Sequence, residues 1–122
     1  MTALTFEAIP ILRIGSVDEA KAFYCGYLGF VLDWEHYYEP GAPVYMQVSR
    51  NGIRLQLSAN ARFQFGSAVY IDTTGLRAMH AELTANAGRY SPPAISTSPW
   101  NTLQLEMEDP FGNLLRFHEE LT

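Results

Sequence analysis

The sequence predicts an α+β protein in which two βαβββ modules follow one another within a single domain, residues 1–122. Three observations predict this fold. Apolar and polar residues alternate in several short stretches, two other stretches have helical periodicity, and the same order of elements occurs twice, about 60 residues apart. We expect the first module at about residues 1–60 and the second at about 66–122.

The first module should open with a strand and a helix. Residues 6–14, "FEAIPILRI", are apolar and rich in β-branched side chains, which favours a strand. A helix is expected over residues 17–28. Ser16 and Glu19 have the spacing of a capping box ahead of it, and Gly29 follows its last periodic residue.

Short alternating stretches predict the other three strands of the first module, at 30–37, 44–50 and 53–58. Asn51-Gly52 separates the last two of them. This dipeptide is a strong signal for a two-residue hairpin turn, because both residues tolerate positive φ. The last strands of the first module are therefore expected to pair as an antiparallel hairpin.

The second module repeats the order. A strand is expected at 67–73, and a helix that ends at Gly88 is expected to carry Leu76, Met79, His80 and Leu83 at helical spacing. Three extended stretches follow, at 90–96, 101–108 and 113–119. A Pro/Gly turn at 110–112 joins the last two.

A βαβββ module has a sheet with one face covered by its helix and one bare face. We expect the two modules to form a curved mixed sheet whose bare faces line a trough. An exposed lining of this kind favours association with a second copy, so a homodimer is expected.

Composition excludes several classes of function. The net charge is −5, with seven arginines and one lysine, which argues against a nucleic-acid partner. No apolar run approaches the ~20 residues of a membrane span, so no membrane partner is expected. Cys25 is the single cysteine, which excludes an internal disulfide and favours a reducing compartment. We expect a cytoplasmic protein.

The two halves, together with "AKAFYCGYLGF" and "EDPFGN", resemble the vicinal-oxygen-chelate superfamily, which includes the glyoxalases. Four pieces carry a closer resemblance to the bleomycin resistance proteins: "AIPIL", "LGFVLDW", "SPPAIST" with the following "PW", and "EDPFGNLLRFHEE". That resemblance implies a dimer with ligand grooves at its interface. Pro10 matches the proline at which the first strand of those proteins crosses to the partner subunit, so strand exchange is implied as well.

In the enzymes of this superfamily, four side chains in the trough bind a divalent metal. The resemblance places those positions at Ile9, Gln56, Ala68 and Arg116. Isoleucine and alanine offer no ligand atom, and Arg116 brings a fixed positive charge without an acceptor. We therefore expect no metal, no cofactor and no catalytic residue. Asp72 should share the face of Arg116, and a plain ion pair between the two is the structural alternative.

The resemblance places groove aromatics at Trp34, Tyr45 and Trp100, with Asp33 beside the first. Strand alternation leaves Gln56, Arg116 and His118 on the trough face. Flat aromatic faces stack on planar rings and attract cations when acids lie nearby. The alternative for Trp34 and Tyr45 is that they build the core of the dimer.

These features predict a metal-free protein, not an enzyme, of the bleomycin resistance type. It would sequester a planar cationic glycopeptide antibiotic, or a similar aromatic ligand, in grooves at a dimer interface. One alternative is a metal-dependent lyase, isomerase or dioxygenase of the same superfamily. Another is a structural dimer whose groove has no ligand.

Overall fold

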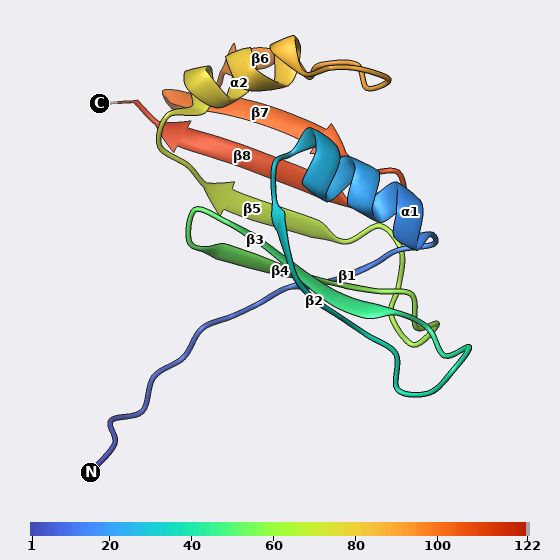
Figure 1. Ribbon diagram of the computed structural model, residues 1–122. Coiled ribbons are helices and arrows are strands. Elements are labelled where there is room, and N and C mark those ends of the chain that lie inside the picture. Colours follow the sequence, from blue (N-terminus) through green and yellow to red (C-terminus); the bar gives the residue numbers. More distant parts are fainter. Residues whose placement is uncertain (122) are drawn as a thin grey trace.

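The computed structural model describes residues 1–121 and contains two mixed four-stranded sheets, which confirms the α+β fold (Figure 1). The first sheet has the strand order β1-β4-β3-β2. Its strands are β1 (Ile11–Arg13), β2 (Val31–His36), β3 (Tyr45–Arg50) and β4 (Ile53–Ser58).

The second sheet repeats this topology with the order β5-β8-β7-β6. Its strands are β5 (Ala68–Asp72), β6 (Ile95–Thr97), β7 (Thr102–Glu108) and β8 (Leu114–Glu120). In both sheets the first strand runs parallel to the last, and all other neighbours are antiparallel. The tandem βαβββ order predicted from the sequence is therefore the order found.

The first helix begins as predicted but is not α-helical throughout. Ser16 Oγ accepts a hydrogen bond from Glu19 N at 3.3 Å and caps α1 (Val17–Ala20). The chain continues as a π-helical segment, η1 (Lys21–Tyr27), in which Leu28 N donates to Phe23 O, five residues back, at 2.9 Å. Periodicity located the helix, but its wider turns were not predicted. The second helix, α2, spans Leu76–Ala85. Among residues 1–121, no helix has the length and apolar character needed to cross a membrane.

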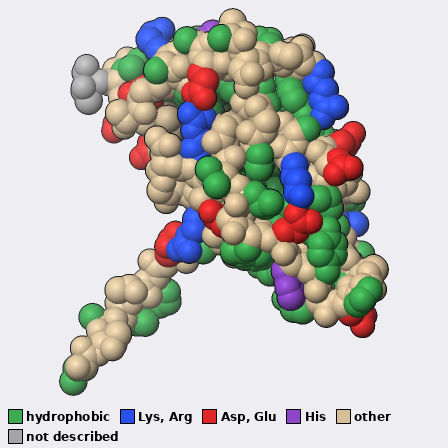
Figure 2. Space-filling view, in the orientation of Figure 1, with side chains coloured by type: hydrophobic (Ala, Val, Ile, Leu, Met, Phe, Trp, Pro, Cys, Tyr) green, Lys and Arg blue, Asp and Glu red, His purple; other side chains and the backbone are tan. Residues whose placement is uncertain are grey.

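The expected strand over residues 6–14 is mostly wrong. Only Ile11–Arg13 pair as β1, and residues 1–10 form an arm that projects from the body (Figures 1 and 2). Pro10 has no N–H, and the ladder begins where Gln56 N donates to Pro10 O at 2.9 Å. Leu4 and Phe6 on this arm are 81% and 89% exposed. Leu12 and Ile14 of the expected strand are buried in the core, whereas Phe6 belongs to an uncovered segment.

One cluster of buried hydrophobic side chains includes residues from both halves of the chain. A buried polar contact joins the halves beside it: Tyr24 Oη in η1 donates to Asp109 Oδ2, in the turn before β8, at 2.6 Å. Asp109 also accepts hydrogen bonds from Phe111 N and from the backbone and side-chain nitrogens of Asn113. Burial and this carboxylate raise the pKa of Tyr24, so its hydroxyl stays protonated as the donor.

We predict that Tyr24→Phe lowers the free energy of unfolding by ~1.5–3 kcal/mol, because a buried hydrogen bond to a charged group is lost. Urea denaturation at pH 7 measures this difference. Tyr27→Phe is the matched control, because the Tyr27 hydroxyl is buried without a hydrogen-bond partner. Its removal should not lower the free energy of unfolding, because no hydrogen bond is lost. Equal effects of the two substitutions would contradict the role given to Asp109.

Candidate functional site

The first sheet has one face that does not pack against the core. Along β3, Met46 and Val48 point into the core, whereas Tyr45, Gln47 and Ser49 occupy the opposite face. Gln56 of β4 lies directly across from Gln47. This polar face, called the β3 face below, carries most of the predicted groove residues.

A β-bulge brings two neighbouring residues onto the β3 face. The pairing of β2 with β3 shifts between Leu32 and Trp34, so Asp33 is the extra residue. In a regular strand Asp33 and Trp34 would point to opposite faces. Here Asp33 accepts a hydrogen bond from Ser49 Oγ at 2.8 Å, and the Trp34 ring meets the Tyr45 ring edge-on at 5.1 Å between centroids. The bulge thus sets an acid beside an aromatic pair.

A chain of hydrogen bonds runs across the β3 face and ends at that acid. Tyr45 Oη donates to Gln56 Oε1, and Gln56 Nε2 donates to Gln47 Oε1 at 3.1 Å. Gln47 Nε2 then donates to Asp33 Oδ2 at 3.0 Å. Every donor points toward the carboxylate, which fixes the orientation of both amides. Four of the side chains are therefore held in place before any ligand arrives.

Beside this network lies an open hollow of about 400 Å³ with an aromatic lining: Trp34, Glu35, His36, Tyr38 and Tyr45. Trp34 is 37% exposed, so part of its ring is available to a ligand. Lys21 Nζ lies 2.6 Å from Glu35 and, together with the Tyr37 hydroxyl, lowers the pKa of that carboxyl. The hollow has the volume and the flat walls that suit a planar group.

A second polar cluster lies on the second sheet. Arg116 Nε donates to Glu106 Oε2 at 2.9 Å, and His118 Nε2 lies 3.1 Å from the same oxygen. The Tyr70 ring covers His118, with 4.7 Å between ring centroids. His118 is only 2% exposed, and its Nδ1 is buried without a hydrogen-bond partner. Arg116 and then His118 lower the pKa of Glu106, so the cluster holds an ionised carboxylate.

The ion pair between Asp72 and Arg116, which was the structural alternative for these two residues, does not form. Asp72 lies across from His118 in the β5–β8 register, and Arg116 lies across from Tyr70 on one side and Glu106 on the other. Sequence reasoning did not single out Glu106. The signal was present, because pairing two strands outward from the 110–112 turn puts Glu106 opposite Arg116.

The seven predicted groove residues fall into separate groups. Trp34, Tyr45, Asp33 and Gln56 meet on the β3 face, whereas Arg116 and His118 meet around Glu106 on the other sheet. Trp100 lies in the turn before β7 and is 67% exposed. The protein chain by itself does not bring Trp100 against either group.

The positions at which the superfamily's enzymes bind a metal do not fit one here. The strand register differs from the expected one, because Ile11 rather than Ile9 lies across from Gln56, and Tyr70 rather than Ala68 lies across from Arg116. The Gln56 amide is already bonded to Tyr45 and Gln47, and Arg116 brings a positive charge. Within residues 1–121, no three His, Cys, Asp or Glu side chains converge as a metal site would require.

The surroundings of Cys25 do not favour a nucleophilic role. This residue is a free thiol in η1 and is half-buried. Burial raises its pKa, which disfavours the thiolate that attacks a substrate or binds a metal. Cys25 packs against the core instead.

Comparison with known families matches residues 1–122 to the family described as "Glyoxalase superfamily protein". The chain therefore belongs to the glyoxalase superfamily, as its sequence motifs predicted. No curated protein sequence matches the chain.

Solved structures support the same fold. A bleomycin resistance determinant encoded on the transposon Tn5 is 21% identical, with a TM-score of 0.73, and the alignment covers 97% of this chain and 100% of that one. The bleomycin-binding protein of Streptomyces verticillus, complexed with copper(II)-bleomycin, is 21% identical with a TM-score of 0.69, covering 99% and 100%. A glyoxalase family protein from Bacillus anthracis is 14% identical with a TM-score of 0.73, covering 98% and 100%. At these identities the likeness establishes the fold.

We predict that Glu106→Ala lowers the free energy of unfolding by ~1–3 kcal/mol, because the buried His118 ring loses its hydrogen-bond partner. Chemical denaturation at neutral pH tests this value. Glu108→Ala is the control, since Glu108 is an exposed acid two residues along the same strand. It should cost less than about 0.5 kcal/mol. A loss at Glu108 as large as that at Glu106 would show that Glu106 does not hold His118.

Proposed function

We propose that this protein is a metal-free binding protein of the bleomycin resistance type. It sequesters a planar cationic glycopeptide antibiotic, or a similar aromatic ligand, in grooves at the interface of a homodimer. Sequestration requires affinity but no transition-state chemistry. The absence of a fitting donor set at the superfamily's metal positions supports binding over catalysis.

The observation that carries this proposal is the aromatic hollow beside Asp33. The Trp34–Tyr45 pair offers flat faces to a planar ring system, and the Asp33 carboxylate lies on the same face for a cationic tail. Tyr45, Gln56 and Gln47 are already oriented by their mutual hydrogen bonds, so binding would cost little further ordering.

The ion pair at Arg116 removes an objection to a cationic ligand. A free guanidinium in the groove would repel such a ligand. Glu106 lies 2.9 Å from Arg116 and offsets that charge. In the proposed groove, Arg116 and His118 would line the wall contributed by the second sheet, and Trp100 would flank it from the turn before β7.

The N-terminal arm supports the proposed dimer. Leu4 and Phe6 remain almost fully exposed, and hydrophobic side chains are visible along the projecting arm (Figure 2). Glu7 pairs with Arg54 at the base of the arm, next to the β3 face. A second copy that bound this arm would cover its apolar side chains. The arm would leave its own subunit at Pro10.

Bleomycin titration by calorimetry tests the binding proposal. We expect saturable binding that Trp34→Ala and Trp100→Ala each weaken by ~1–3 kcal/mol, since one stacking ring is lost. Trp34→Phe is the control, because it keeps a ring and should retain most of the affinity. Thermal unfolding should show all three variants folded. If neither alanine variant changed the affinity for bleomycin, the aromatic groove would be excluded as the binding site.

Removal of residues 2–8 tests the dimer. Light scattering after gel filtration should give a dimer for the full chain and a monomer for the shortened one, because the exchanged apolar segment is lost. The double variant Leu4→Ser with Phe6→Ser should weaken the dimer in the same direction. A monomeric full chain, or a shortened chain that remains dimeric, would count against exchange of the arm.

A further inference from the structure

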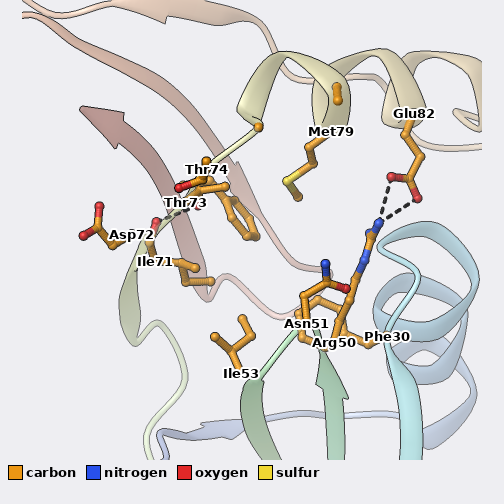
Figure 3. A pocket seen from close by; sticks show the side chains of 13 residues that line it. Phe30, Arg50, Asn51, Ile53, Ile71, Asp72, Thr73, Thr74, Met79 and Glu82 are labelled. Carbon is orange, nitrogen blue, oxygen red and sulfur yellow. Dashed lines mark hydrogen bonds and ion pairs between the residues drawn. The ribbon is translucent and has the colours of Figure 1, made fainter. Parts of the chain in front are cut away.

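A separate cavity of about 520 Å³ lies between the two halves, away from the β3 face (Figure 3). The end of the β3–β4 hairpin forms one wall, with Arg50, Asn51 and Ile53. The segment from β5 into α2, residues 72–79, forms another. This volume lies within the range of small-molecule sites.

The two halves repeat one packing arrangement, and this explains why the cavity is there. On one side, the β7–β8 turn of the second half reaches the start of the first helix. Phe111 from that turn fills the space there, and a Cβ on Gly15 would lie 3.6 Å from its ring. The corresponding contact on the other side pairs the β3–β4 turn with the start of α2. There, a Cβ on Gly75, which is the N-cap residue of α2 and so follows the position equivalent to Gly15, would meet nothing within 4 Å.

The difference comes from the lengths of the two turns. The β7–β8 connection spans residues 109–113 and carries Phe111. The β3–β4 connection has only Asn51 and Gly52 between its strands and carries no large side chain. The β7–β8 turn thus fills the space beside the first helix with an aromatic ring. The β3–β4 turn has no such ring, so the corresponding space beside α2 stays open.

The lining favours an apolar guest. The cavity wall includes five hydrophobic side chains: Phe30, Ile53, Ile71, Met79 and Phe117. Asn51, Thr73 and Thr74 add hydrogen-bonding groups at the rim. A ring with one hydroxyl group matches this division between an apolar wall and a polar edge.

Arg50, the cation of the cavity lining, is already paired with an acid. Arg50 Nη2 donates to both carboxylate oxygens of Glu82 at 3.1 and 2.8 Å, and the pair closes one side of the cavity (Figure 3). The Asp72 carboxylate is turned away from Met79 and Arg50 in the same view. An anionic guest would lose its hydration without gaining a free cation, and a cationic guest would find only the Asp72 carboxylate, which is turned away, so the guest should be neutral.

We propose that this inter-module cavity binds an uncharged monocyclic aromatic compound of the phenol class. The ring takes the place that Phe111 occupies in the other half of the repeat, and the hydroxyl faces the Asn51–Thr74 rim. The cavity is lined by side chains other than those of the β3 face, so it is a second site, independent of the proposed antibiotic groove.

Titration of the full chain with 4-fluorophenol, followed by ¹⁹F NMR, tests this site. Methyl labelling of the four methionines reports the location, because Met79 lines the cavity while Met1 lies on the arm. We expect saturable binding, with the largest methyl shift at Met79. No saturation, or an unshifted Met79 methyl, would overturn the proposal.

Two variants on the same helix sharpen the test. Ala78 is exposed and lines the cavity, so Ala78→Phe should fill the opening and weaken 4-fluorophenol binding at least tenfold. Ala81 is also exposed on α2 but does not line the cavity, so Ala81→Phe should stay within twofold of wild type. Equal binding by both variants would overturn the assignment.

Two further titrations separate this site from the antibiotic groove and test the choice of a neutral guest. Trp34→Ala should bind 4-fluorophenol like wild type, whatever its effect on bleomycin. 4-Fluorobenzoate should bind at least tenfold more weakly than the phenol. A benzoate that binds as tightly would contradict the neutral class, and loss of phenol binding in Trp34→Ala would relocate the site to the groove.

Discussion

The buried Asp109 carboxylate is the interaction on which the rest of the structure depends. It receives four hydrogen bonds: from the Tyr24 hydroxyl, from two backbone N–H groups of its own turn, and from the Asn113 side chain. A buried charge is tolerated only when it is compensated in this way. Because Tyr24 belongs to the first half and Asp109 to the second, satisfying the charge fixes the two halves against each other.

The contact between Tyr24 and Asp109 also explains why the two halves pack differently where a hairpin turn of one half meets the helix of the other. The turn that carries Asp109 brings Phe111 against Gly15 and lets Asn113 Nδ2 donate to Arg13 O at 2.9 Å. The corresponding contact between the halves on the other side is the ion pair of Arg50 with Glu82, which lies at the surface. A short turn beside a surface ion pair leaves a cavity, whereas the longer turn around the buried carboxylate places the Phe111 ring near Gly15.

The helices and the core lie on one face of each sheet, so the proposed antibiotic groove uses the other faces. These faces have diverged. Gln56 occupies, in the first half, the place that Arg116 occupies in the second, and each is tied to a partner on the adjacent strand, Gln47 or Glu106. Both side chains therefore already have hydrogen-bond partners. Gln56 belongs to a chain of amides that ends at Asp33, and Arg116 forms an ion pair with Glu106 next to the buried His118.

The sequence by itself determined what depends on neighbouring residues: the two helices, the Asn51-Gly52 hairpin, the repeated order of elements and the alternation that buries Leu55 and Leu57. Periodicity and turn chemistry are local, so they can be read along the chain. Tertiary structure alone decided the bulge that turns Asp33 and Trp34 to one face, the π-helical turns of η1 and the uncovered arm. Each of these depends on strand register or on packing between distant segments, where a shift of one residue moves a side chain to the opposite face.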